Sequence, residues 1–313
     1  MELHRTKVVL IGAGMVGMSF AYTAIAQGVC SDLLLLDIDE EMAYGEALDL
    51  QHAVPFFSKN TSVSSGNYSD CKDADIAVIA AGKSQLPGES RLDLVQKNAE
   101  VIRSVVTSLT ASGFSGIIVV VTNPVDVMSY VAMKSSNLGP HKVLGSGTSL
   151  DSGRLRHVLA DKLNVAPTSV HTYIIGEHGD SSLPTYSCST VGGKPILDYV
   201  KEGILTEQDL EESYTYVRDA AQEIIKRKKA TYYGIGAALT KIVQAIVRDE
   251  KIIMPLGSYL DGEYGEHDIY IGVPAIIGKD GIEGVIEIPL CSKEKERFAA
   301  SCDILRSVMQ SVV

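Results

Sequence analysis

The chain has 313 residues, enough for about two domains of ordinary size. Hydrophobic residues make up 45% and charged residues 21% of the chain, which excludes a disordered chain, a collagen-like fibre and a small disulfide scaffold. With 39 acidic and 28 basic residues, the formal net charge is −11. Because such a field repels nucleic acid and anionic membranes, we expect neither as a partner. No segment is apolar enough to predict a membrane-spanning helix.

The five cysteines are scattered and form no Cys-x-x-Cys pair, so we expect no metal site, and reduced thiols in a cytoplasmic protein. One segment competes with this prediction. Residues 8–31 carry no formal charge and follow basic residues, which is the outline of a secretory signal peptide. Glycines and polar residues interrupt its apolar core, and the glycine spacing has a physical meaning of its own. We therefore expect this segment to be part of the fold.

The first half of the chain alternates short apolar runs with stretches of helical period, such as 93–112. The runs are continuous, as in strands buried on both faces. They lie at 7–11, 33–38, 75–80, 116–122 and 142–144. Strand–helix alternation predicts an α/β fold with a doubly wound parallel sheet of the Rossmann type.

The second half differs, because strands punctuated by Gly and Pro are mixed with long helices. The strands are expected at 270–277 and 284–289, and the helices at 207–232 and 293–310. This pattern predicts a mixed α+β C-terminal catalytic domain. The composition changes near 145–149, so we expect domains over 1–146 and 147–313. A helix near 237–248 is expected to return and pack on the first domain.

A dinucleotide motif directly follows the first expected strand. In the sequence GAGMVG, Gly12 allows a tight turn, Gly14 lets backbone amides approach a pyrophosphate, and Gly17 lets the helix pack on the strand. The helix N-terminus adds partial positive charge for the phosphates. Asp37 ends the second strand and can accept both ribose hydroxyls of NAD, whereas it would repel the 2′-phosphate of NADP. A chance glycine run with a surface Asp is the alternative, but the order of strand, glycines, helix and acid predicts an NAD-binding domain.

Four further segments, 80–91, 121–126, 147–156 and 175–180, place polar residues among apolar neighbours. The first is rich in Gly and Pro after a buried strand, a composition that suits a mobile loop over a site. His178 has the ordinary pKa of a general acid/base, and a nearby Asp151 would raise that pKa and fix the tautomer. Arg91 and Arg154 suit the polarisation of a carbonyl and the binding of a carboxylate, but spacing does not assign them. Each of these residues taken alone is more often structural than catalytic.

With these motifs the sequence resembles the L-lactate/L-malate dehydrogenase family along essentially its whole length. Within that family it is similar to the bacterial L-lactate enzymes. The motifs that carry the resemblance are GAGMVG, LLLLD, AGKSQLPGESR, TNPVD, LDSGRLR, GEHGDSS and ATYYG.

The resemblance implies a role for each of these residues. His178 matches the general acid/base, Asp151 its orienting carboxylate, and Arg154 the residue that binds the substrate carboxylate. Arg91 matches the loop arginine that polarises the carbonyl, and Asn123 the side chain that hydrogen-bonds the substrate oxygen. The cofactor site implied by the resemblance comprises Gly12, Gly14, Val16, Gly17, Asp37, Tyr68, Gly82 and Asn123.

Substrate choice is expected to depend mainly on Gln85. In the family Gln is the lactate-type residue at this position, and Arg is the malate-type residue. Oxaloacetate would bring a second carboxylate into a closed pocket without a counter-charge, at a cost of several kcal/mol, which is on the order of thousandfold discrimination. Thr231 is expected to line the same pocket and to favour a methyl-bearing substrate. We therefore expect pyruvate and L-lactate, without excluding slightly larger 2-keto acids.

Arg156 and His171 match residues that bind fructose 1,6-bisphosphate between subunits in allosterically activated bacterial enzymes of the family. Two cationic groups that face their symmetry mates would repel each other, and the phosphates would neutralise them. The resemblance therefore implies a homotetramer with this effector. The alternative is that Arg156 caps a helix and His171 is a buried polar residue.

Three other functions compete with a lactate-type dehydrogenase. A malate or branched 2-hydroxy-acid dehydrogenase is disfavoured by Gln85. An NAD-dependent glycoside hydrolase on the same type of fold would need a Cys/His-bound metal, and no ligand spacing for one is present near Asn123 or His178. A catalytically idle structural protein is disfavoured by the complete set of His, Asp and two Arg residues.

Overall fold

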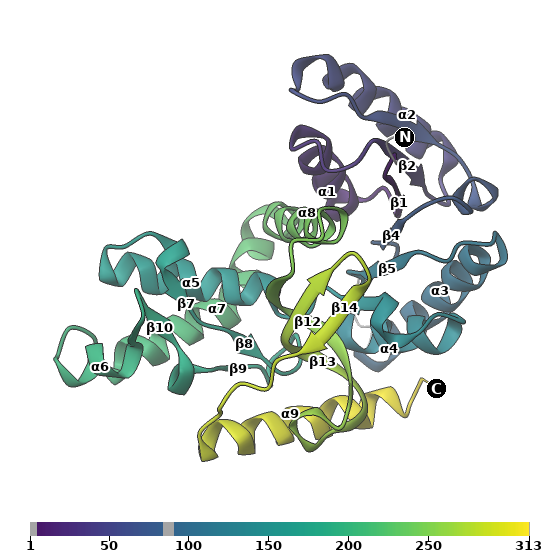
Figure 1. The fold of residues 1–313 in the computed structure, drawn as a ribbon. Coiled ribbons are helices and arrows are strands. Elements are labelled where there is room, and N and C mark those ends of the chain that lie inside the picture. The colour runs from purple at the N-terminus through teal and green to yellow at the C-terminus, as the bar shows by residue number, and fades with distance from the viewer. Residues whose placement is uncertain (1–4, 84–90, 313) are drawn as a thin grey trace.

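The structure is a computed structural model that describes residues 5–83 and 91–312. A nine-stranded sheet with the order β14-β13-β12-β6-β5-β4-β1-β2-β3 runs through the molecule (Figure 1). Strands β1 to β6 are parallel to one another, and the strand order reverses between β4 and β1. The chain therefore forms the predicted doubly wound Rossmann sheet. The parallel strands are β1 (Lys7–Ile11), β2 (Asp32–Leu36), β3 (Ser62–Ser65), β4 (Ile76–Ile79), β5 (Ile117–Val120) and β6 (Val143–Gly145).

Alternate residues of these strands belong to two separate cores, one on each face of the sheet. Val8 and Leu10 of β1 pack under α1 and α8, whereas Val9 and Ile11 pack on the face of α3 and α4. This two-sided burial explains why the strand sequences are continuously apolar. The helices that follow the first strands are α1 (Met15–Ala26), α2 (Glu40–Ala53), α3 (Arg91–Ala111) and α4 (Val125–Ser135).

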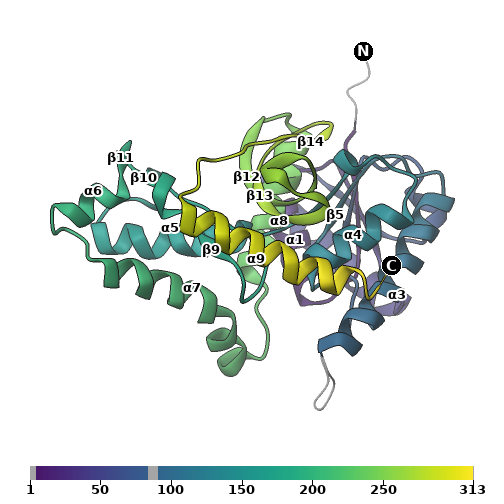
Figure 2. The ribbon, with the colours of Figure 1, turned by 90° about the horizontal axis from the view of Figure 1, so that it is seen from below.

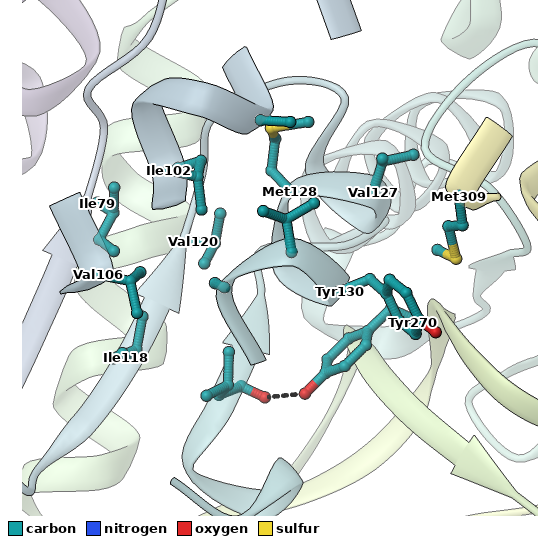
Figure 3. Close-up of a cluster of buried hydrophobic side chains, with 14 of the residues drawn as sticks. Ile79, Ile102, Val106, Ile118, Val120, Val127, Met128, Tyr130, Tyr270 and Met309 are labelled. Atoms are coloured by element: carbon teal, nitrogen blue, oxygen red, sulfur yellow. Dashed lines mark hydrogen bonds between the residues drawn. The ribbon is translucent and has the colours of Figure 1, made fainter. Parts of the chain in front are cut away.

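Figure 3 shows part of the core on the α3 and α4 face. Ile118 of β5 lies beside Val106 of α3, and Val120 of β5 lies beside Ile102 of the same helix, near Met128 of α4. Tyr270 closes the cluster, and its hydroxyl donates a hydrogen bond to the carbonyl of Val143 at 2.9 Å. The core of the first half therefore continues into residues from the second half of the chain.

The second half also extends the large sheet. Strand β12 (Ile252–Asp261) pairs with β6 in antiparallel orientation, and β13 (His267–Gly278) and β14 (Gly281–Val285) follow it. A Cβ at Gly257 would lie 3.1 Å from the Cα of Gly145, so the two strands cross closely at this pair. Because one sheet spans both halves, the division of the chain near residue 146 stays a prediction.

The other elements of the second half, which include two small sheets and several helices, lie beside the large sheet. The strands β7 (Val170–His171), β10 (Thr190–Val191) and β11 (Lys194–Pro195) form one small sheet, and β8 (Ile174–Ile175) pairs with β9 (Leu183–Pro184). A third core lies between α5 (Ser149–Leu163), α6 (Ile196–Lys201) and α7 (Glu207–Lys228). Figure 2 shows α9 (Ser292–Met309) extending from the side of α5 to the side of α3 and α4. The second half is thus the predicted mixture of helices and strands.

The predicted returning helix is α8 (Tyr233–Val247), which lies against α1 (Figure 1). A Cβ at Gly236 would lie 2.7 Å from the Cβ of Ser19, so the glycine permits this close crossing. The helix begins four residues earlier than predicted. The preceding helix α7 ends at Lys228 rather than at Tyr232, because Lys229 adopts a left-handed conformation with φ 75°.

Two strands of the large sheet were not predicted, and the position of one predicted strand was displaced. Strand β3 has the polar sequence SVSS, and β12 is interrupted by Pro255 and Gly257, so neither shows an apolar run. The strand predicted at 284–289 is β14 at 281–285, because Ile288 donates its N–H to the hydroxyl of Tyr264 instead of to a neighbouring strand. Among the described residues no helix is both long and apolar enough to cross a membrane.

Candidate active site

The glycine-rich loop between β1 and α1 is shaped by close backbone contacts. Gly12 has φ +106°, and a Cβ there would lie 2.5 Å from the backbone nitrogen of Ala81. A Cβ at Gly17 would lie 2.1 Å from the carbonyl oxygen of Gly12. By contrast, none of the described residues comes within 4 Å of the Cβ position of Gly14, so among them the loop is open at the N-terminus of α1. A dinucleotide pyrophosphate fits an open helix N-terminus of this kind.

Asp37 directly follows β2 and is attached to the same loop. Its Oδ2 accepts the N–H of Ala13 at 2.7 Å, and its Oδ1 accepts the N–H of Asp39 at 3.0 Å. The carboxylate is therefore held at the carboxyl edge of the sheet, next to the glycines. Each oxygen of an ionised carboxylate has a second acceptor site, so Asp37 keeps the capacity to bind ribose hydroxyls.

The other predicted cofactor residues lie along the same edge of the sheet. Val16 is half-buried in the first turn of α1, and Tyr68 begins a short 3-10 helix after β3. Gly82 follows β4, and Asn123 follows β5. In a doubly wound sheet, ligands bind at this carboxyl edge, near the point where the strand order reverses. The fold thus gathers the predicted NAD residues along one edge.

His178, Asp151 and Arg154 lie together, as the sequence predicts. The Nδ1 atom of His178 is 2.7 Å from Oδ2 of Asp151. Arg154 Nη1 donates to Oδ1 of the same carboxylate at 3.0 Å. Asp151 and Arg154 are one helical turn apart at the start of α5, whereas His178 lies in the turn after β8. One buried carboxylate therefore orients both the imidazole and the guanidinium.

The charges of this cluster shift the proton affinities of its members. The charge of Asp151 outweighs the opposing effect of burial and raises the pKa of His178 to about 9. Burial would raise the pKa of Asp151, but the charge and hydrogen bond of His178, together with Arg154, lower it. His178 is therefore protonated, and Asp151 ionised, through the neutral range. A protonated imidazole held in this way can donate a proton to a carbonyl oxygen.

Comparison with known proteins identifies the family. The lactate/malate dehydrogenase NAD-binding domain matches residues 6–145, and the α/β C-terminal domain of the same family matches residues 148–313. The chain belongs to the lactate/malate dehydrogenase family. It is accordingly an oxidoreductase with NAD as its cofactor.

Individual members of the lactate/malate dehydrogenase family match over their full length. An L-lactate dehydrogenase of Mycoplasma capricolum subsp. capricolum is 50% identical over 313 residues, covering 100% of this chain and 99% of that protein. An L-lactate dehydrogenase 2 of Bacillus anthracis is 47% identical over 308 residues, with 98% of both chains covered. The crystal structure of a minor L-lactate dehydrogenase from Enterococcus mundtii, in its ligand-bound form, superposes with a TM-score of 0.97 at 48% identity and covers 99% of each chain.

Two of the predicted substrate residues cannot be placed in this family site. Gln85 lies outside the described residues, and of Arg91 only its place at the start of α3 is described. Thr231 is half-buried between α7 and α8. Within the described residues, no three His, Cys, Asp or Glu side chains are grouped to hold a metal ion.

The two predicted effector residues lie near each other, away from the cofactor edge. Arg156 is half-buried on α5, and its Nε donates to the carbonyl of Thr172 at 3.3 Å. Its guanidinium lies over the ring of Tyr173, 5.6 Å from the centroid. His171 precedes Thr172 on β7, a strand at the edge of its small sheet. His171 is exposed, so the alternative of a buried polar histidine is wrong.

Sequence reasoning missed Asn98, a buried residue of α3 that joins two site segments. Asn98 Oδ1 accepts the N–H of Lys83 at 2.8 Å, and Nδ2 donates to the carbonyl oxygens of Lys83 at 3.2 Å and of Asn123 at 2.8 Å. The carboxamide thus ties the end of the segment after β4 to the segment after β5. A buried polar residue in an otherwise helical, amphipathic stretch was the signal that could have identified it.

Sequence reasoning also gave no role to Asp126, although it is part of the TNPVD motif. Asp126 is 1% exposed and lies in the first turn of α4. Its Oδ2 accepts the backbone N–H of His178 at 2.8 Å. A second carboxylate therefore contacts the histidine from its main-chain side.

Proposed function

We propose that the protein is an NAD-dependent L-lactate dehydrogenase that interconverts pyruvate and L-lactate. The observation that carries this proposal is the His178–Asp151–Arg154 cluster, which offers a proton donor and a carboxylate-binding cation side by side. The full-length relatives named L-lactate dehydrogenase support the same substrate. When bound, the reduced cofactor NADH would supply the hydride for the substrate carbon of pyruvate, and the oxidised form NAD⁺ would accept it from L-lactate.

His178 donates the proton to the carbonyl oxygen of pyruvate and takes it back from L-lactate. Asp151 fixes the tautomer in which Nδ1 carries the shared proton, so that Nε2 is the atom that exchanges a proton with the substrate. The ionised Asp151 also stabilises the charged imidazolium before transfer. These are the roles of a positioned general acid and its orienting carboxylate.

Arg154 binds the substrate carboxylate. Within the described residues its only hydrogen bond is the one that Nη1 donates to Asp151. The Nε and Nη2 groups can therefore donate hydrogen bonds to a substrate carboxylate. A guanidinium presents a planar pair of donors that matches a carboxylate. Asn123 is proposed to hydrogen-bond the substrate oxygen, and Arg91 to polarise the carbonyl. The chemical reason for Arg91 is that a second cation stabilises the negative charge that develops on this oxygen.

Gln85 and Thr231 are proposed to select the methyl group of pyruvate. A neutral amide at 85 offers no counter-charge to the second carboxylate of oxaloacetate. Thr231 lies two residues before the start of α8, and this helix packs on α1, which follows the glycine loop. Both residues therefore bear on the group attached to the substrate carbonyl carbon rather than on the chemistry itself.

We also propose that fructose 1,6-bisphosphate binds at Arg156 and His171 in a homotetramer. The exposed His171 and the guanidinium held at Thr172 place two phosphate-binding groups on neighbouring segments. Large apolar side chains are exposed on and beside α2, which subunit contacts would cover: Tyr44, Leu48 and Phe56. We place the enzyme in the cytoplasm, a compartment that keeps its five free cysteines reduced.

NADH oxidation in the presence of pyruvate tests the proposed function. Oxaloacetate and NADPH serve as the competing substrate and cofactor, and each assay is run with and without fructose 1,6-bisphosphate. Turnover of pyruvate with a KM that falls on adding the bisphosphate supports both the enzyme and the effector site. Turnover that ignores the bisphosphate supports the enzyme and contradicts the effector site. No turnover of pyruvate under any condition contradicts the proposed substrate.

A further inference from the structure

The turn that carries His178 is held by three successive backbone N–H groups, each bonded to a different element. Gly176 N–H donates to the carbonyl of Gly272 on β13 at 2.9 Å. Glu177 N–H donates to Oγ of Ser301 on α9 at 2.8 Å. His178 N–H donates to Oδ2 of Asp126 on α4 at 2.8 Å. Of these three acceptors only Asp126 is ionisable, and only Asp126 contacts the residue that exchanges the proton.

The burial of Asp126 in this position costs desolvation free energy. Asp126 is 1% exposed, and its Oδ1 has no hydrogen-bond partner among the described residues. A carboxylate removed from water usually satisfies both oxygens, because each unsatisfied polar atom costs free energy. The first turn of α4 offers partial compensation, since backbone dipoles favour a negative charge there. A neutral acceptor such as the serine used for Glu177 would hold the same N–H at a lower desolvation cost.

The position of Asp126 connects both sides of the proposed site. It lies three residues after Asn123, on the helix that begins directly after Pro124. Its hydrogen bond therefore sets where His178 lies relative to the segment proposed to contact cofactor and substrate oxygen. Asp126 and His178 come from opposite halves of the chain, and the hydrogen bond between them spans 52 positions in sequence.

The charges around Asp126 come from several elements. Glu177 and Asp151 are the acidic neighbours that act on it, and His178 is the basic one. Arg154 on α5 faces the same histidine and opposes its protonation. Burial raises the pKa of Asp126 to about 7, although the hydrogen bond and charge of His178 oppose this rise. Above that pH the ionised Asp126 adds to Asp151 in stabilising the imidazolium.

We infer that Asp126 is a positioning residue for the proton transfer, which fixes the main chain of His178 relative to Asn123 and supports its protonated state from the backbone N–H, whereas Asp151 does so from the ring. This inference depends on the proposed function of His178. The histidine thus contacts two carboxylates, one bonded to its ring and the other to its backbone. Asp151 sets the direction of the ring, and Asp126 sets the place from which the ring extends.

The test compares Asp126→Asn, Asp126→Ser and Asp126→Ala with the parent enzyme. Asn and Ser keep an oxygen that can accept the His178 N–H but remove the charge, whereas Ala removes both. Asp280→Asn, at the exposed turn between β13 and β14, is the matched control for loss of a carboxylate. For each variant we measure NADH binding, thermal unfolding, and kcat and KM for pyruvate from pH 6 to 10. The parent's own turnover of pyruvate is measured first, so failure of the proposed function is seen before any variant is compared.

We expect the pH at which the KM for pyruvate begins to rise to fall by about one unit in Asp126→Asn, because a buried charge beside the histidine is lost. NADH affinity should stay within twofold of the parent value, and Asp280→Asn should leave the pH profile unchanged. Asp126→Ala should in addition lower kcat at every pH, by about tenfold or more, because the backbone of His178 is no longer fixed.

An Asn variant that binds NADH, with a kcat and a pH profile equal to those of the parent, overturns the charge part of the inference. An Ala variant with unchanged kcat overturns the positioning part. If the amide of Asn has no acceptor for its NH2 group and the variant fails to bind NADH, the smaller Ser variant replaces it in the same comparison. A Ser variant with the parent's pH profile then overturns the charge part. If the parent turns over another 2-keto acid instead of pyruvate, the same variants are measured with that acid.

Discussion

His178 and Asp151 are 27 positions apart in the chain, yet Nδ1 of the imidazole lies 2.7 Å from Oδ2 of the carboxylate. Asp151 belongs to the first turn of α5, which directly follows the last parallel strand of the Rossmann sheet. His178 belongs to a turn fastened to β13, α9 and α4. The proposed acid/base pair therefore depends on elements from both halves of the chain.

This pair predicts the pH dependence of substrate binding. With the pKa of His178 raised to about 9, pyruvate binding should be nearly constant through neutral pH and weaken above pH 9, where the imidazolium loses its proton. L-lactate oxidation needs the neutral imidazole, so its kcat/KM should rise over the same range. Steady-state KM values for pyruvate from pH 6 to 10, with NADH affinity as the control, check this. A midpoint near the ordinary histidine pKa of about 6.5 would contradict the assigned environment.

The same pKa shift predicts a contribution to stability. A histidine whose pKa is higher in the folded state stabilises the fold fully below its unfolded pKa of about 6.5, and this contribution is lost as the pH rises through about 9. Asp151 has a lowered pKa, so its contribution is present at neutral pH and is lost in acid. The two pKa shifts therefore stabilise the folded protein together from the acid pH at which Asp151 becomes ionised up to the pH of about 9 at which His178 loses its proton.

Gly17 is predicted to be essential for the cofactor site. In Gly17→Ala the new Cβ would lie 2.1 Å from the carbonyl oxygen of Gly12, so α1 must move away from β1. We expect NADH affinity to fall more than tenfold and the free energy of unfolding to fall by about 1–3 kcal/mol, as for an overpacked core. Fluorescence titration with NADH and denaturant unfolding measure these two effects.

Gly45→Ala is the matched control for this substitution. Gly45 lies inside α2, and no described residue outside the helix comes within 4 Å of its Cβ position, so alanine should leave NADH binding unchanged. It should stabilise the protein by about 0.5–1 kcal/mol, because alanine favours a helix over glycine. Equal losses in both variants would show that Gly17 has no specific role in the loop.

Asn98 is predicted to support both the fold and the site. Asn98→Ala removes three hydrogen bonds from the backbones of Lys83 and Asn123, which should destabilise the protein by about 3 kcal/mol. We expect the KM for pyruvate to rise, because the segment that leads to Gln85 is released from Asn123. Thr110→Ala is the control on the same helix, since in the part of the chain that the structure describes its hydroxyl bonds only to carbonyls of α3 itself. A KM unchanged in Asn98→Ala would separate Asn98 from the substrate site.

Gln85 is predicted to determine the substrate. Gln85→Arg supplies a counter-charge for the second carboxylate of oxaloacetate, so the ratio of kcat/KM for oxaloacetate to that for pyruvate should rise on the order of a thousandfold. The ratio is measured for both enzymes in one buffer, and Gln85→Lys tests whether charge without a bidentate geometry is sufficient. If the ratio is the same in parent and Arg variant, the proposed basis of substrate choice is wrong.

Much of the fold could be predicted because the parallel strands are buried on both faces. Continuous apolar runs predicted both bounds of β1 correctly and the bounds of the other predicted parallel strands within two residues at each end. Strands β3 and β12 lacked this signal, since one is polar and the other contains Pro255 and Gly257. The pairing of β12 with β6 could not be predicted either, because an antiparallel contact at one residue pair produces no pattern in the local amino-acid sequence.

From the sequence, we predicted the site residues to which the motifs assign a role. His178, Asp151 and Arg154 were named from residue type and resemblance, and the structure brings them together. Asn98 and Asp126 were missed because their functions depend on backbone atoms of distant segments. A hydrogen bond to a backbone N–H or C=O places no demand on the sequence at the other end, so no spacing reveals it.

The most direct test of the central claim is the kcat/KM for pyruvate of His178→Gln at pH 7, compared with the parent under saturating NADH. The side chain of Gln keeps a polar group but cannot supply a proton. The account predicts a loss of about 10³-fold, with NADH affinity unchanged. A variant that binds NADH and reduces pyruvate at a rate within tenfold of the parent would contradict the assignment of His178 as the acid.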